Sequence, residues 1–230
     1  TGGALGPPLP AEAFMGMAVI DGFALYAQLV VVLAAIFGVL LALEYLPRHG
    51  IERGEYYTLL TLSALGMMLM SMAADLIVVF VALELLSLPL YILTGFDRTR
   101  STSEEGAMKY FLLGAFSSGF LVYGIALTYG GTGTTRLTGV LDVMAGTAVS
   151  LPLALAGLGL VVVGLGFNVA AVPFHMWTPD VYEGAPTPVT AFMSVGSKVG
   201  GFAALMRLLI AALPGIAAEW GTVMAIIAML

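Results

Sequence analysis

The sequence predicts an all-α protein, a polytopic bundle of transmembrane helices. Of its 230 residues, 60% are hydrophobic and only 10% are charged, whereas soluble domains usually carry about 25% charged residues. The mean hydropathy is +1.04, which indicates a chain whose main solvent is lipid. The apolar residues gather in runs of about 20, the length that crosses a bilayer as a helix.

Seven apolar runs meet this description, and short segments with proline, glycine or charged residues separate them. The predicted helices cover approximately residues 22–46, 56–73, 75–96, 107–129, 151–172 and 187–213, with a seventh that starts near residue 219. We expect residues 1–230 to form a single membrane domain. Because the last run stops inside apolar sequence, we also expect the chain to be a fragment of a longer protein.

The connecting segments carry signals for the ends of these helices. Residues 47–50, Pro-Arg-His-Gly, end the first helix, and the glycines at 130–133 close the fourth. Hydroxyl residues followed by acids at 101–105 are typical of a capping box before the fourth helix. Pro186 and Pro188 open the sixth helix, where the first turn tolerates proline.

Arginines are distributed unequally between the two ends of the predicted bundle. The loops after the first and third helices contain Arg48, Arg53, Arg98 and Arg100, and the opposite end contains Arg136 and Arg207. Short loops rich in Lys and Arg stay on the cytoplasmic side. We therefore expect a multi-pass protein of the bacterial inner membrane with these two loops in the cytoplasm.

Composition also excludes several classes of function. The net charge is −6 and no basic cluster is present, so nucleic acid is not an expected partner. The chain has no cysteine, which excludes iron–sulfur ligation and thiol chemistry. Its two histidines are His49, in a polar loop, and His175, so no histidine pair is available for haem. We expect no cofactor and no metal in this chain.

Two ionisable residues fall near the centres of predicted helices: Glu84 in the third and Lys198 in the sixth. A charge at the middle of a membrane costs roughly 2.5–3.5 kcal/mol on the lenient insertion scale, so such a residue is a candidate functional residue. Their charges are opposite, which allows them to pair. The alternative interpretation is a structural ion pair, or a carboxyl that burial keeps neutral.

The sixth predicted helix carries a polar stripe that includes Lys198. Small and hydroxyl residues recur on it every three or four positions: Thr187, Thr190, Ser194, Ser197 and Gly201. One face of the helix is therefore polar, and it is suited to line a hydrated path in which Lys198 titrates. Hydrogen bonding between helices is the alternative role for such a stripe.

The fifth predicted helix contains a proline that should break it. Pro173 removes the hydrogen bond to the carbonyl of Val169, and broken helices at membrane depth are tolerated where they line a cavity or are buried in protein. Asn168 lies beside the break. His175 follows it and is able to titrate near neutral pH.

The segment around this break resembles a known signature. Residues 164–189 read GLGFNVAAVPFHMWTPDVYEGAPTPV, and they are similar to the antiporter-like membrane subunits of respiratory complex I. Residues 83–91, LELLSLPLY, and Ser197-Lys198-Val199 match as well. The WTPDVY portion is most similar to the subunit N branch of bacterial NADH:quinone oxidoreductases, which has a counterpart in the chloroplast NDH complex. The resemblance covers nearly the whole chain.

The resemblance implies a fold of about fourteen helices with two inverted five-helix repeats, of which residues 56–213 are the first. It implies that Glu84 pairs with a lysine and that Lys109 and Lys198 pass protons on. The position beside the break is usually a lysine in this family, whereas this chain has Asn168. An amide does not titrate, so at this position the implied relay of protons is either interrupted or carried by water. His175 would lie on the same path.

The implied function is proton translocation by a subunit that does no redox chemistry itself. NADH, FMN, iron–sulfur clusters and quinone would belong to partner subunits, and the other partners would be membrane-arm subunits, the lipid bilayer, protons and water. A subunit of an Mrp-type cation/proton antiporter, or of an energy-converting hydrogenase, is one alternative. A structural membrane spacer that conducts nothing is another.

Overall fold

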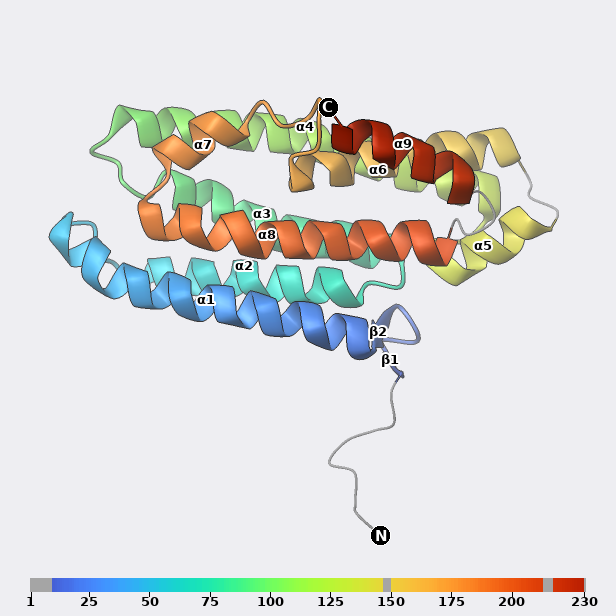
Figure 1. Cartoon of the computed structure of the whole chain (residues 1–230), viewed down its shortest axis with the longest axis horizontal. Helices are drawn as coiled ribbons and strands as arrows, with labels where there is room; N and C mark the ends of the chain where they lie inside the picture. The colour runs from blue at the N-terminus through green and yellow to red at the C-terminus, as the bar shows by residue number, and fades with distance from the viewer. Residues whose placement is uncertain (1–9, 147–149, 213–216, 230) are drawn as a thin grey trace, which may run out of the picture.

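The computed structural model describes residues 10–146, 150–212 and 217–229, which form a bundle of antiparallel helices preceded by a small β-hairpin (Figure 1). The elements in chain order are β1 (Ala11–Ala13), β2 (Ala18–Ile20), α1 (Gly22–Arg48), α2 (Glu55–Met72), α3 (Leu76–Thr94), α4 (Ser101–Thr132), α5 (Leu137–Ala145), α6 (Leu151–Val169), α7 (Thr178–Gly184), α8 (Thr187–Arg207), the π-helical turn η1 (Leu208–Ala212) and α9 (Ala217–Met229). The predicted all-α class is confirmed.

Within the described residues, five helices are long and apolar enough to cross a membrane: α1, α3, α4, α6 and α8 with its π-helical extension to Ile210. The prediction of seven spans therefore holds for five. Helix α2 has 18 residues and is not among these five, because its first turn, Glu-Tyr-Tyr-Thr, makes it less apolar than they are. Helix α9 has 13 described residues. The predicted end of the sixth helix, at residue 213, lies outside the described residues.

Helix α4 differs most from its predicted bounds. It begins at Ser101 rather than near residue 107, because the segment read as a capping box forms its first turn. The residue before it, Arg100, makes no side-chain cap, and Glu104 lies in the first turn, where a negative charge suits the helix dipole. The helix ends at Thr132, and Gly133 follows with a φ of 75°, so the glycines do close it as predicted.

The predicted break near Pro173 is confirmed. Helix α6 ends at Val169 rather than near residue 172, and the chain continues as a loop containing the cis Val172–Pro173 peptide before α7 begins at Thr178. Two short helices, α5 and α7, were not predicted. Both lie between spans, and their nine and seven residues are too few to cross a bilayer.

Glycines allow close approaches between the helices. A Cβ added at Gly124 of α4 would lie 2.7 Å from the carbonyl oxygen of Gly157 on α6. These two helices therefore pack almost backbone to backbone, which is typical of membrane helices joined by small residues. Helix α3 lies beside α2 and α4, and α8 lies beside α1 and α2 (Figure 1).

The two ends of the bundle differ in their polar residues. The loops after α1 and α3 lie at one end, where Arg53 and Arg98 line a common cavity of about 460 Å³. The hairpin and α5 lie at the other end (Figure 1). There Arg136 donates a hydrogen bond of 2.6 Å to the carbonyl of Met15 and so holds the hairpin turn.

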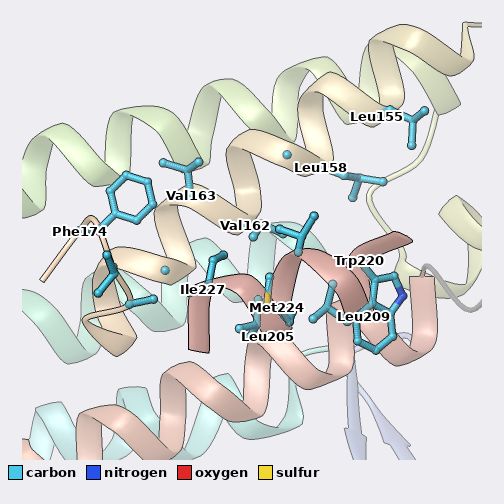
Figure 2. Close-up of a pocket in the computed structure, with 15 residues that line it drawn as sticks. Leu155, Leu158, Val162, Val163, Phe174, Leu205, Leu209, Trp220, Met224 and Ile227 are labelled. Atoms are coloured by element: carbon cyan, nitrogen blue, oxygen red, sulfur yellow. The ribbon is translucent and has the colours of Figure 1, made fainter. Parts of the chain in front are cut away.

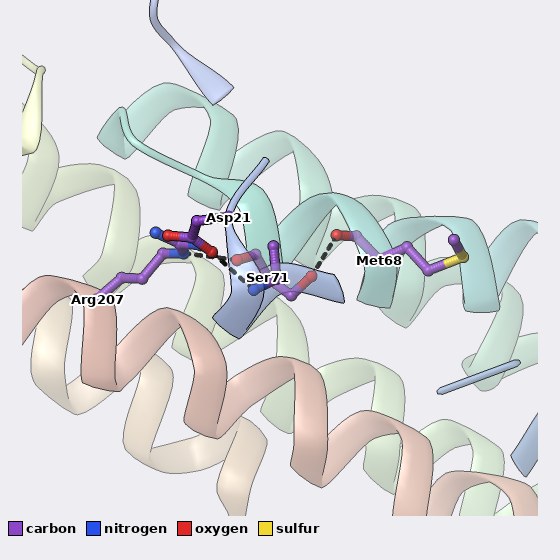
Figure 3. A network of polar contacts seen from close by, with 5 residues as sticks. Asp21, Met68, Ser71 and Arg207 are labelled. Atoms are coloured by element: carbon purple, nitrogen blue, oxygen red, sulfur yellow. Dashed lines mark hydrogen bonds and ion pairs between the residues drawn. The ribbon is translucent and has the colours of Figure 1, made fainter. Parts of the chain in front are cut away.

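Arg207 joins three helices at this second end (Figure 3). Its Nη2 lies 2.7 Å from Oδ1 of Asp21, and its Nε donates to the carbonyl of Ser71 at 2.6 Å. Asp21 also accepts from the backbone N–H of Ala24 and caps α1. Burial alone would raise the pKa of Asp21, but the hydrogen bonds from Arg207 and Ala24 outweigh it and lower the pKa. Asp21 and Arg207 thus fasten α1, α2 and α8 together.

Candidate functional site

Glu84 lies half-buried on α3 and faces α4. Its Oε1 accepts a hydrogen bond from the hydroxyl of Ser118 on α4. The carboxyl lines an open groove of about 530 Å³ between these two helices, together with Tyr91, Phe111 and other mostly apolar residues. The carboxyl therefore rests on a neutral hydroxyl in a largely apolar setting.

Lys198 reaches from α8 to the carboxyl end of α6. Its Nζ donates to the backbone carbonyl of Asn168 at 3.1 Å and lies 4.5 Å from the ring centroid of Trp177. The carboxyl end of a helix carries partial negative charge on its free carbonyls, which favours a cation there. The amine is thus held by a helix end and an aromatic face, both of which are neutral groups.

The end of α6 is a tightly closed turn. Ala170 has a φ of 60° and donates to the carbonyl of Phe167 at 3.0 Å, while Ala171 donates to Gly166 at 2.8 Å. This pair of bonds is the Schellman arrangement, here with alanine where glycine is usual. The indole N–H of Trp177 also donates to Phe167, at 3.1 Å. The carbonyl of Asn168 is left to Lys198.

Asn168 is 5% exposed, and its side chain points into packed protein. Its Nδ2 lies 4.0 Å from Sδ of Met70, and a Cβ added at Gly201 would lie 2.9 Å from the same nitrogen. Methionine sulfur is a weak acceptor. Lys198 contacts the backbone carbonyl of Asn168 and not its side-chain amide. Asn168 therefore contributes a main-chain acceptor to this site, which any residue at this position would provide.

Lys109 lies elsewhere, near the start of α4. Its Nζ is 2.7 Å from both Glu105 and Asp180, and its side chain is 42% exposed. Along α4 it precedes Ser118 by nine residues, about 13 Å at 1.5 Å per residue. The structure therefore brings Lys109 to carboxylates at the end of the bundle and not to Glu84.

His175 is exposed in the loop between α6 and α7, and its ring makes no hydrogen bond to any described residue. The pairing considered for Glu84 and Lys198 is also not formed, because neither makes an ion pair within the described part of the chain. Of the five candidate residues expected from the sequence, the structure brings two together at one place, Asn168 and Lys198.

Two residues of the site were not singled out from the sequence: Ser118 and Trp177. The sequence gives no signal for Ser118, because it lies 34 residues from Glu84 on another helix. Trp177 lies within the signature at residues 164–189 and has no separate signal of its own. It is 1% exposed and stacks on Tyr110 at 4.6 Å with 7° between the ring planes.

A separate apolar groove lies between α6, α8 and α9 (Figure 2). It has a volume of about 350 Å³, and Leu158, Val162, Leu205 and Met224 are among the residues that line it. None of the lining residues is titratable. The groove therefore contributes no group able to carry a proton.

Comparison with known proteins defines the family. A family model described as the transmembrane region of NADH:quinone oxidoreductases and Mrp antiporters matches residues 73–230. The chain belongs to this family. The match includes α3, α4, α6 and α8, and with them every candidate residue discussed above.

Relatives named subunit N of NADH-quinone oxidoreductase are similar along nearly the whole chain. The subunit N 2 of Roseiflexus castenholzii is 51% identical over 98% of this chain and 46% of its own length. The subunit N of Chloroflexus aggregans is 50% identical over 97% of this chain and 47% of its own length. The chain thus spans less than half the length of these relatives.

Solved structures share the fold. A chain of respiratory complex I from Thermus thermophilus has a TM-score of 0.72 and 42% identity, covering 86% of this chain and 42% of that one. A chain of the membrane-bound sulfane sulfur reductase, an archaeal respiratory complex, has a TM-score of 0.76 and 27% identity over 86% of this chain and 40% of that one. A chain of the Mrp complex from Dietzia, at 24% identity, a TM-score of 0.75, and coverage of 88% and 37%, is similar in fold alone. The predicted antiporter-like fold is confirmed.

Proposed function

We propose that this chain is the first half of a proton-translocating, subunit N-type component of an NADH:quinone oxidoreductase. The observation that carries the proposal is 51% identity to such a subunit over 98% of the chain. In this proposal residues 56–213 are the first of two five-helix repeats, and the subunit does no redox chemistry itself. It couples electron transfer in partner subunits to proton movement.

The surroundings of Glu84 support a role in proton transfer. A group that takes up and releases a proton needs hydrogen bonds in both of its charge states. The hydroxyl of Ser118 is able to donate to a carboxylate and to accept from a protonated carboxyl. Glu84 therefore keeps its partner when its charge changes, which makes both states accessible within the bundle.

The surroundings of Lys198 have the same property. The carbonyl of Asn168 accepts an N–H from an ammonium or from a neutral amine, and both retain N–H donors. The amide of Asn168 does not titrate, so the family's usual lysine beside the break is missing here. In our proposal Lys198, which reaches from α8 to the carbonyl of Asn168, takes the place of that lysine as the titratable group at the end of α6.

The remaining candidates would lie toward the ends of the path. Lys109, with Glu105 and Asp180, forms an exposed charged cluster that is suited to exchange protons with bulk water. The exposed ring of His175 lies beside the break and is the least supported member of the path. Water would connect these groups, because their separations exceed direct hydrogen bonds.

The proposal implies partners and a location. NADH, FMN, iron–sulfur clusters and quinone would be bound by partner subunits, and this chain would contact other membrane-arm subunits and lipid. The loops after α1 and α3 would face the cytoplasm of a bacterium, with the protein in its inner membrane. Single cysteines at Arg53 and at Asp142 should then react with impermeant reagents from opposite sides, and reaction from the same side would contradict this topology.

The alternative functions are less well supported. An Mrp-type antiporter or an energy-converting hydrogenase would share the fold, but similarity to the Mrp and sulfur reductase structures is 24% and 27%, against 42% for complex I. The subunits that purify with this chain would separate these cases. A structural spacer would require no titratable group inside the bundle, and Glu84 and Lys198 are both there.

Replacing Glu84 by Gln tests the proposal, since it keeps the shape and the hydrogen bond to Ser118 but removes titration. In the assembled complex we expect Glu84→Gln to lower the number of protons moved per electron pair. Glu44→Gln is the matched control, because Glu44 is exposed on α1 and its ion-pair partner among the described residues is Arg48. Normal proton movement in Glu84→Gln, with assembly intact, would favour the structural spacer.

A further inference from the structure

Trp177 is held rigidly by neighbours from three helices. Its ring stacks on Tyr110 of α4 at 4.6 Å and on Phe167 of α6 at 5.4 Å, and Tyr182 of α7 meets it edge-on at 6.2 Å. Its indole N–H donates to the carbonyl of Phe167. With 1% of its surface exposed, the ring has one fixed position and orientation.

The side chain of Lys198, by contrast, has a long flexible stem. Its Nζ has two contacts that fix it: the carbonyl of Asn168 at 3.1 Å and the ring of Trp177 at 4.5 Å from the centroid. A cation within about 6 Å of an aromatic face is attracted by the ring quadrupole, and most strongly by tryptophan in a desolvated site. The rigid ring therefore determines where the amine lies.

We propose that Trp177 is a positioning residue for Lys198. Its indole face holds the amine against the carboxyl end of α6 and so fixes the point from which Lys198 accepts and releases its proton. This inference rests on the proposed function, because it requires Lys198 to carry protons. The gain is preorganisation: a proton-transfer group on a flexible stem reacts faster when its reacting atom is already in place.

The other contacts of Trp177 do not explain its approach to Lys198. The stacking on Tyr110 and Phe167 and the bond to the carbonyl of Phe167 are sufficient to fasten the loop after α6. None of them involves the amine. A purely structural tryptophan would serve equally well with an uncharged residue at position 198, and this difference makes the two roles separable by experiment.

The sharpest test weakens the cation–π contact while keeping the shape of the ring. Tryptophan, 5-fluorotryptophan and 5,7-difluorotryptophan are placed at position 177 of the full-length subunit in its assembled complex. Fluorine withdraws electron density from the ring face, so proton movement should fall stepwise, by roughly two- to thirtyfold in all. Electron transfer in the presence of an uncoupler should not change.

Two conventional variants extend the test. Trp177→Phe keeps a ring face and should retain most of the proton movement, whereas Trp177→Leu removes the face and should lose it. Trp220→Leu is the matched control, since Trp220 lines the apolar groove between α6, α8 and α9. Combining Trp177→Leu with Lys198→Met should add nothing to the loss caused by Lys198→Met alone.

Each outcome decides the matter. Stepwise loss of proton movement on fluorination, together with a defective Lys198→Met variant, supports the positioning role. Equal proton movement across the fluorinated series, while Lys198→Met is defective, overturns this inference and leaves the proposed function standing. Normal proton movement in Lys198→Met removes Lys198 from the path and overturns both. Should Trp177→Leu fail to assemble, the fluorinated series still decides, because it leaves the packing unchanged.

Discussion

The charged groups inside the bundle and those at its ends have different kinds of partner. At the ends, Arg207 pairs with Asp21 and Lys109 pairs with Asp180, each at 2.7 Å between opposite charges. Inside, Glu84 rests on a serine hydroxyl and Lys198 on a carbonyl and an indole ring. Each of these charged groups at the ends thus contacts an opposite charge, whereas each of the two interior groups contacts neutral polar or aromatic groups.

The difference bears on the partly buried Asp21–Arg207 pair, whose charges hold helices together, and on Glu84 and Lys198, whose partners are neutral. Neutralising one member of the partly buried Asp21–Arg207 pair leaves the other charge uncompensated and so destabilises the fold. A carboxyl beside a hydroxyl, or an amine beside a carbonyl, keeps a hydrogen bond in either state. We therefore propose that Asp21 and Arg207 fasten the fold and that Glu84 and Lys198 transfer protons.

Lys198 should give the largest effect. Lys198→Met removes the titratable group, and losing a positioned acid–base group typically slows a reaction by roughly a hundredfold or more. Lys198→Arg separates titration from capping, because arginine keeps the charge and the donor to Asn168 but does not release its proton. Both variants should assemble and fail to move protons, measured as protons per electron pair. Normal proton translocation by Lys198→Arg would mean that a fixed positive charge at position 198 is sufficient and that Lys198 need not release a proton.

Ser118→Ala should give the next largest effect. It leaves Glu84 without its hydroxyl donor, and a hydrogen bond to a charged group contributes about 1.5–3 kcal/mol, so proton movement should fall roughly tenfold. Ser117→Ala is the neighbouring control, since Ser117 donates instead to the carbonyl of Gly164 on α6. If the two alanine variants behaved alike, the hydroxyl beside Glu84 would have no special role.

Asp21→Asn should destabilise the protein without affecting proton movement. Asparagine still caps α1, so the change isolates the contact with Arg207, whose charge is left unpaired. Thermal unfolding of the detergent-solubilised complex should shift down by a few degrees. A loss of proton movement in a fully assembled Asp21→Asn complex would break the distinction between the two groups of charges.

The same pair predicts a pH dependence. Because the pKa of Asp21 is lowered in the folded protein, its stabilising contribution is complete above the unfolded value of 3.8 and is lost as the pH falls through the lower folded value. Acid unfolding of the wild type should therefore include this loss, and Asp21→Asn should not show it. Identical acid profiles would mean that the Arg207 contact contributes nothing measurable.

Asn168→Ala should give the smallest effect. Lys198 uses the backbone carbonyl of Asn168, which alanine keeps. Among the described residues, the hydrogen-bond partner of the side-chain amide is the weakly accepting sulfur of Met70. Proton movement should stay within about twofold of the wild type. A large loss would show that the amide itself holds part of the path.

The sequence predicted the helical class, the break at Pro173 and the two interior charges, because hydropathy, proline and buried charge each leave a local signal. It did not predict α5 and α7, which are too short to appear as spanning runs. Nor did it predict the partner of either charge. Ser118 lies on a different helix from Glu84. The partner of Lys198 is a backbone carbonyl, and because every residue has one, the sequence does not indicate which carbonyl binds the amine.

Infrared difference spectroscopy can show whether Glu84 changes its protonation state during turnover. Reduction of the assembled complex by NADH should produce a carbonyl-stretch change from a protonated carboxyl group. We expect this band in the wild type and in Glu44→Gln, and we expect it to be absent in Glu84→Gln. A band of unchanged intensity in Glu84→Gln would show that Glu84 keeps one charge state throughout and would rule out its role in proton transfer.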